Sequence, residues 1–151
     1  MSAENRDFTI AKKSDIQGTG LFAKKDIPRG TRVMAYEGLR VSKLNLLNDL
    51  ANGLTNMIYV MNLNETMVID GERGGNAARF INHSCEPNCE VLFFNETPYI
   101  YAMQEIPQTE ELSFDYKLGF GNEVAITDEQ KKAWFPCNCG AKTCKGTTLG
   151  Q

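Results

Sequence analysis

The 151-residue chain lacks an excess of basic residues: 16 Lys and Arg stand against 19 Asp and Glu, which gives a formal net charge of −3. Domains that bind nucleic acids usually carry a basic face that neutralises phosphates, so we expect no direct nucleic-acid contact. The chain also has no stretch of about 20 apolar residues that could cross a membrane, and no export signal at its start. These absences predict an intracellular protein that is not membrane-bound and not secreted by a classical signal.

Cysteine is missing from the chain before Cys85, and five cysteines follow from there on. In a reducing compartment, cysteines favour metal binding or catalysis over disulfides. Cys137, Cys139 and Cys144 crowd within eight residues, and structural zinc takes four ligands, so a fourth must come from elsewhere. The candidates for the fourth ligand are Cys85, Cys89 and, as a third option, His83. The alternative is a set of thiols without a metal.

Glycine and proline are scattered, so nothing marks a linker, and the length suits one domain. Short strands are predicted at residues 8–11, 20–23, 31–36, 58–61, 67–70, 89–94 and 98–103, with hairpins joining 58–61 to 67–70 and 89–94 to 98–103. Helices are predicted at 42–51, 76–81 and 127–134; in the first, Leu44, Leu47, Leu50 and Ala51 have helical spacing after a Ser42 cap. The predicted fold class is mostly β with short helices.

Residues 75–89 (GNAARFINHSCEPNC) combine the predicted short helix with an abrupt polar turn at residues 82–85. Asn82 and His83 follow the apolar pair Phe80 and Ile81, so we expect both to be drawn toward the interior, where polar groups need partners. They either satisfy the backbone or hold a ligand. For a lone histidine such as His83, a structural role is the commoner of the two.

Four segments resemble the motifs of SET-domain protein-lysine methyltransferases, in that family's order. Residues 79–85 (RFINHSC) and 111–116 (ELSFDY) resemble its two signatures, residues 18–23 (GTGLFA) its Gly-x-Gly motif, and residues 137–146 its post-SET zinc segment. Residues 75–89 together with 136–142 (PCNCGAK) are most similar to the trithorax and mixed-lineage-leukaemia branch. The resemblance implies small curved β-sheets around a pseudoknot, in which one signature threads through a loop made by the other. It implies a SET domain over residues 1–117, with a variable insert at about 40–56, and a linker helix and zinc-bound post-SET segment over 118–151.

The resemblance also implies site residues and two bound groups. S-adenosylmethionine would be the methyl donor, and its contacts would come from Gln17, Gly18, Thr19, Gly20, Tyr59, Asn82, His83 and Asn138. Tyr116 would be the central catalytic residue, and Tyr59 and Phe114 would line the channel for the substrate lysine. Because relatives usually have tyrosine where this chain has Phe114, the resemblance implies a di- or trimethyl product. One structural zinc would be held by Cys85, Cys137, Cys139 and Cys144, which would fasten the tail over the site and leave Cys89 over.

The partner implied by this family is a basic protein substrate such as a histone tail, and activating protein partners are common in the trithorax branch. That places the protein in the nucleus or on chromosomes in a eukaryote, or in the host nucleus for a bacterial or viral protein. Two alternatives within the family are a non-catalytic SET-fold binding module and a methyltransferase for a non-histone protein. Outside it, a zinc-ribbon-like binding module and a redox or zinc sensor remain open.

Overall fold

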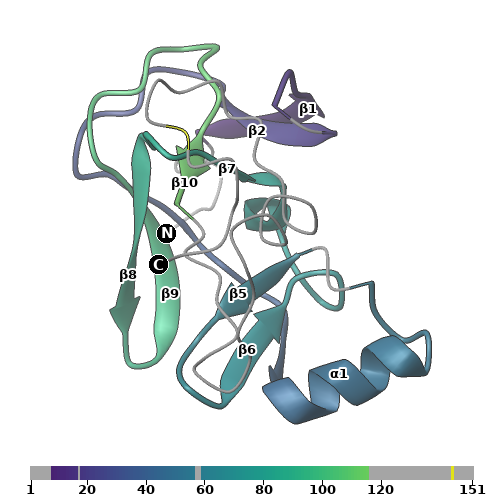
Figure 1. Cartoon of the computed structure of the whole chain (residues 1–151). Coiled ribbons are helices and arrows are strands. Elements are labelled where there is room, and N and C mark those ends of the chain that lie inside the picture. Colours follow the sequence, from purple (N-terminus) through teal and green to yellow (C-terminus); the bar gives the residue numbers. More distant parts are fainter. Residues whose placement is uncertain (1–7, 17, 57–58, 116–143, 145–151) are drawn as a thin grey trace.

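The computed structural model describes residues 8–16, 18–56, 59–115 and 144, and the described part is built mainly from short strands in small sheets (Figure 1). Two sheets have two strands: β1 (Thr9–Lys13) with β2 (Thr19–Ala23), and β7 (Asn82–His83) with β10 (Ser113–Phe114). Two have three strands, in the orders β3 (Arg32–Ala35), β9 (Thr97–Ala102), β8 (Cys89–Phe94) and β4 (Leu39–Ser42), β6 (Met67–Asp70), β5 (Val60–Asn62). Within the described residues, the helical elements are α1 (Lys43–Ala51) and a 3₁₀ turn, η2 (Ala77–Phe80). The mostly β prediction is confirmed.

Both predicted hairpins are present. Strands β5 and β6 pair antiparallel, and so do β8 and β9, whose register runs from Cys89 opposite Ala102 to Phe94 opposite Thr97. The turn of the second hairpin holds Asn95 and Glu96 at positive φ, 51° and 64°. Two left-handed residues give a turn whose twist matches that of the flanking strands, which explains the tight connection.

The core lies between the sheets and draws on segments far apart in sequence. Along β9, Pro98, Ile100 and Ala102 are buried while the tyrosines between them are partly exposed, which is the alternation of a strand with one face inward. The largest fully buried apolar side chains are Leu21, Ile27, Ile69, Ile81, Ile100, Ile106 and Leu112. These isoleucines and leucines hold the small sheets together, since no one sheet is large enough to form a core alone.

Helix α1 forms at the predicted place, but it turns a different face inward than its leucine spacing indicates. Ser42 caps it, because the Ser42 Oγ accepts a hydrogen bond from the Asn45 backbone N at 3.0 Å. Leu46 is the buried residue of the helix, whereas Leu44 is 70% and Leu47 54% exposed. In Figure 1 the helix lies at the periphery of the described part of the chain.

Three short strands were not predicted: β4, β7 and β10. The second and third have two residues each and pair in parallel, with Asn82 opposite Ser113 and Phe114 opposite His83. Ser84 extends the contact, since its backbone N donates to the Phe114 carbonyl at 3.1 Å. The polar turn expected at residues 82–85 is thus partly strand. In the described part of the chain, no helix has the length and apolar character needed to span a bilayer.

Candidate active site

A hydrogen-bonded triangle of Ser14, Asn82 and Glu111 joins three segments that are distant in sequence. The Ser14 hydroxyl lies 2.8 Å from each oxygen of the Glu111 carboxylate and donates to it. The Asn82 side-chain nitrogen donates to Glu111 Oε2 at 2.9 Å and to Ser14 Oγ at 3.2 Å. It also lies 3.4 Å from the carbonyl of Thr19. The triangle therefore connects the turn before β2, strand β7 and the residue that leads into β10.

Positions 18 and 20 require glycine for different structural reasons. Gly18 adopts φ +45°, a left-handed conformation that favours glycine, and a Cβ there would meet no described atom within 4 Å. At Gly20, a Cβ would contact Glu111 Oε2 and lie 2.9 Å from both Glu111 Cδ and Ser14 Cβ. The second glycine of the motif thus makes room for the Glu111 carboxylate, which rests against the backbone of β2.

The buried side chain of Asn88 fixes the backbone between Glu111 and β10. Its Nδ2 donates to the Glu111 carbonyl at 2.9 Å, and its Oδ1 accepts from the Ser113 backbone N at 2.9 Å. On the other side, the Leu112 backbone N donates to the Leu21 carbonyl at 2.8 Å. Held from both sides, the segment has little freedom to slide past β7.

His83 is buried, with 3% of its surface exposed. Its Nδ1 lies 3.6 Å from Asp115 Oδ1, and its Nε2 lies 3.5 Å from Cys85 Sγ. The expectation that this histidine is drawn toward the interior is met. Its neighbours join the two signature segments a second time, beyond the β7–β10 pairing.

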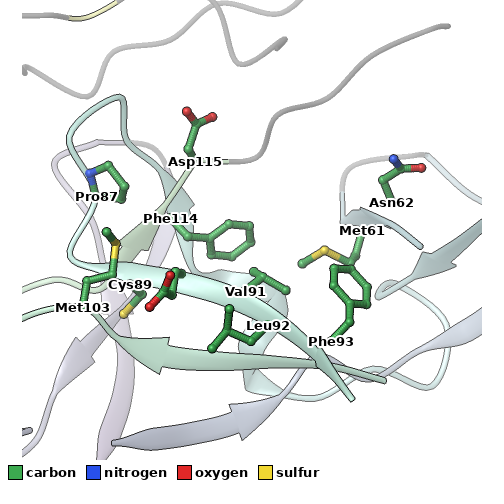
Figure 2. A pocket seen from close by; sticks show the side chains of 11 residues that line it. Met61, Asn62, Pro87, Cys89, Val91, Leu92, Phe93, Met103, Phe114 and Asp115 are labelled. Carbon is green, nitrogen blue, oxygen red and sulfur yellow. The ribbon is translucent and has the colours of Figure 1, made fainter. Parts of the chain in front are cut away.

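A cavity of about 620 Å³ opens beside β10 (Figure 2). Phe114, which is 4% exposed, lies in its wall, and Figure 2 shows its ring between β10 and β8. The lining is mainly apolar and includes Met61, Pro87, Cys89, Val91, Leu92, Phe93 and Met103, together with the polar Asn62, Glu90 and Asp115. An apolar wall with a few acidic groups suits a ligand with an aliphatic stem and a positive charge.

Tyr59 occupies a different place, next to β5. Its carbonyl accepts hydrogen bonds from the Tyr36 hydroxyl at 3.0 Å and the Gly71 backbone N at 2.6 Å, and its ring meets Phe80 edge-on at 5.9 Å. Burial, aided by the Asp70 carboxylate, raises the pKa of Tyr36 well above its ordinary value, so this hydroxyl stays protonated and donates. Of the predicted channel residues that the structure describes, Phe114 lines the cavity and Tyr59 does not.

Comparison with known proteins agrees with this arrangement, since residues 18–117 match the SET domain family. The chain belongs to the SET domain family. It is 38% identical over 141 residues to histone-lysine N-methyltransferase 2B of Homo sapiens, a match that covers 88% of the chain and 5% of that protein.

Two further relatives of this SET domain have similar identity. Histone-lysine N-methyltransferase trithorax of Drosophila virilis is 34% identical over 146 residues, which cover 93% of the chain and 4% of that protein. A Chaetomium globosum protein named histone-lysine N-methyltransferase, H3 lysine-4 specific, is 35% identical over 142 residues, 89% of the chain and 12% of the relative. The chain thus spans a small fraction of the length of these relatives, and the resemblance to the trithorax branch is confirmed.

The site residues expected of this SET domain do not all lie together in the structure. Thr19, Gly20 and Asn82 come together around Glu111, the Gly18 carbonyl accepts a hydrogen bond from the Ser14 backbone N, and His83 follows Asn82 on β7. Phe114 lines the cavity, and Tyr59 lies apart from its lining. Five expected residues lie outside the part of the chain that the structure describes: Gln17, Tyr116, Cys137, Asn138 and Cys139.

The structure describes two of the four expected zinc ligands. Cys85 and Cys144 are described and partly exposed, and no three metal-binding side chains lie together among the described residues. Cys89 is 1% exposed in the core, and burial raises the pKa of its thiol to about 12. Burial therefore favours the protonated thiol at Cys89.

Sequence reasoning gave no role to Ser14, Asn88 or Glu111. Strand alternation gives only a misleading signal for Glu111, because a strand that buries Leu112 would place Glu110 on the same inward face and Glu111 on the opposite one. Glu110 is the exposed one. For Ser14 and Asn88 no such local pattern exists, because their partners lie 97 and 23 residues away.

Proposed function

We propose that this SET domain is a protein-lysine N-methyltransferase that transfers methyl groups from S-adenosylmethionine to a lysine in a histone tail. The relatives named above are histone-lysine N-methyltransferases by their names. One observation carries the proposal: Glu111 ties the Gly18–Gly20 turn to Asn82, while the β7–β10 pairing joins the strand of Asn82 to the strand of Phe114, which lines the cavity. A methyl donor and a lysine must meet in such a place, and positioning is most of what this reaction requires.

The chemistry of the donor set fits the cofactor. Thr19 is exposed, and the open space beside Gly18 leaves the turn's backbone accessible among the described residues. Asn82 and His83 present amide and ring groups on the neighbouring strand. When bound, S-adenosylmethionine supplies an activated methyl group on a positive sulfonium. We propose that these residues and Gly20 bind it, with Gln17, Tyr59 and Asn138 as further contacts.

The lysine must react as a neutral amine, although its ordinary pKa is about 10.4. We propose that contact with the apolar side chains beside Phe114, such as Met61 and Val91, displaces water from an inserted side chain and so favours the neutral form. We propose that the hydroxyl of Tyr116 orients the amine and that the proton leaves through water. No strong side-chain base is then required.

A basic substrate segment fits the acidic groups at the cavity. Glu90 and Asp115 are part of its lining, and the chain as a whole has a net charge of −3. Opposite charge steers a Lys- and Arg-rich tail toward the site. A histone tail has this character, and such a substrate places the protein at chromatin. Activating partner proteins are part of the same proposal.

The surroundings of Cys85 support a role for zinc in completing the site. Cys85 lies three residues after Asn82, and its Sγ is 3.5 Å from His83 Nε2, so a metal at Cys85 would adjoin the cofactor contacts. Four cysteine thiolates form a structural zinc set. We propose that Cys85, Cys137, Cys139 and Cys144 bind one zinc ion, whose affinity would hold the C-terminal segment against the site.

The experiment is methyl transfer from labelled S-adenosylmethionine to recombinant histone H3. The wild-type chain, with any activating partner supplied, is expected to label the histone, and Tyr116→Phe to lose most of that activity. Tyr99→Phe is the matched control, because Tyr99 of β9 packs against Arg32 of β3 and is not part of the cavity lining. Equal inactivity of wild type and Tyr116→Phe, with cofactor binding retained, would favour a non-catalytic binding module instead.

A further inference from the structure

We propose that Glu111 is a positioning residue that sets the affinity for S-adenosylmethionine by holding the side chain of Asn82; this rests on the proposed function. Glu111 is not among the groups expected to touch the cofactor. It acts through Asn82 and Ser14. The Glu111 carboxylate accepts a hydrogen bond from the Asn82 side-chain nitrogen at 2.9 Å and another from the Ser14 hydroxyl at 2.8 Å.

The triangle fixes which way the Asn82 amide faces. Its nitrogen lies within 3.4 Å of a carboxylate oxygen of Glu111, the Ser14 hydroxyl and the Thr19 carbonyl. A carboxylate and a carbonyl are acceptors only, so the amide oxygen cannot take this side without repulsion. Glu111 and Thr19 therefore settle an orientation that an isolated asparagine would leave open, and a ligand meets a preset side chain.

Ser14 transmits the same restraint to the turn before β2. Its hydroxyl donates to Glu111 while it accepts from the Ile16 backbone N at 2.9 Å, and its own backbone N donates to the Gly18 carbonyl at 2.8 Å. Ser14 is 7% exposed, so these bonds are little weakened by water. The Glu111 carboxylate therefore fixes the position of the turn before β2 relative to the Asn82 side chain.

Glu111 can serve as a firm support because its own backbone is held on two sides. The Asn88 side chain donates a hydrogen bond to the Glu111 carbonyl, and the Glu111 backbone also pairs with that of Phe22 of β2 in a single antiparallel β-bridge. Its carboxylate rests against Gly20, where even a methyl group would collide with it. The side chain thus has little room to rearrange.

The test is a double-mutant cycle on the whole chain, with calorimetric binding of S-adenosylmethionine as the readout. In Glu111→Gln one acceptor oxygen becomes a donor while the shape is kept, so it is expected to weaken binding about tenfold, with kcat at saturating cofactor within about twofold of wild type. In an Asn82→Ala background the same change is expected to weaken binding by less than about twofold, because its target is gone. Glu110→Gln, at the exposed neighbouring position, is the control and is expected to bind like wild type.

A second variant covers the case in which Glu111→Gln does not fold. Ser14→Ala removes one corner of the triangle and is expected to weaken binding about threefold, again only when Asn82 is present. Equal effects with and without Asn82, or a lower melting temperature with unchanged cofactor affinity, would overturn the positioning role. Absence of S-adenosylmethionine binding by the wild type would instead overturn the proposed function itself.

Discussion

The Glu111 carboxylate lies directly against the backbone of Gly20, so closely that a side chain at position 20 would collide with it. This contact gives the second glycine of the Gly-x-Gly motif a steric purpose within the protein. The first, Gly18, has a conformational purpose, since its φ is +45° and the space beside it is open.

The two glycines should therefore respond differently to substitution. Gly20→Ala is expected to destabilise the fold by about 2–3 kcal/mol, because Glu111 and Ser14 must move. Gly18→Asn is expected to cost less than about 1 kcal/mol, since asparagine tolerates the left-handed region. Urea unfolding of both variants measures the difference; equal losses would contradict the steric explanation for Gly20.

Phe114 should govern the degree of methylation. A tyrosine hydroxyl at this position would place a polar group in the apolar cavity wall and hold a water or the amine there. Phe114→Tyr is therefore expected to shift the product from di- or trimethyl-lysine toward monomethyl-lysine. Mass spectrometry of a reacted histone peptide reads the product, and Phe94→Tyr, on an exposed position outside the cavity lining, is the control. A wild type that makes only monomethyl-lysine at saturating cofactor would refute this prediction.

Zinc should depend on Cys85 and not on Cys89. Elemental analysis of the purified chain is expected to find about one zinc per molecule, to lose it in Cys85→Ser and Cys144→Ser, and to retain it in Cys89→Ala. Removal of the metal by a chelator is expected to weaken cofactor binding, because the C-terminal segment is then no longer fastened. A folded, active chain without zinc would contradict this role.

Leu46, and not the leucine stripe of α1, should anchor that helix. Leu46 is 3% exposed, so Leu46→Ala is expected to lower the free energy of unfolding by about 2–3 kcal/mol. Leu44 is 70% exposed, and Leu44→Ala is expected to change stability by less than about 0.5 kcal/mol. Thermal unfolding of the two variants compares them, and a larger loss for Leu44→Ala would contradict the observed burial.

That helix shows what local pattern can and cannot predict. Its position and its Ser42 cap follow from neighbouring residues, and so do the β8–β9 hairpin and its turn at Asn95. The inward face of α1 depends on what lies beneath it, which no spacing of leucines encodes. The exposed stripe of Leu44, Leu47 and Leu50 is therefore not predictable from periodicity.

The site divides along the same line. Asn82, His83 and Phe114 were found by resemblance to family motifs, while strands β7 and β10 were missed because two-residue strands exist only through their long-range pairing. Glu111 lies within the second signature, but the sequence predicts no role for it, because its partners Ser14 and Asn82 lie 97 and 29 residues away. Such a contact can be seen only in the folded chain.

Methyl transfer to lysine is measured most directly by the mass of a histone H3 tail peptide after incubation with the wild-type chain and S-adenosylmethionine. The expected result is a gain of two or three methyl groups on one lysine, absent when Tyr116→Phe replaces the wild type and absent when that lysine is replaced by arginine. An unchanged peptide mass across histone tails, from a folded, cofactor-binding chain supplied with its activating partners, would contradict the account.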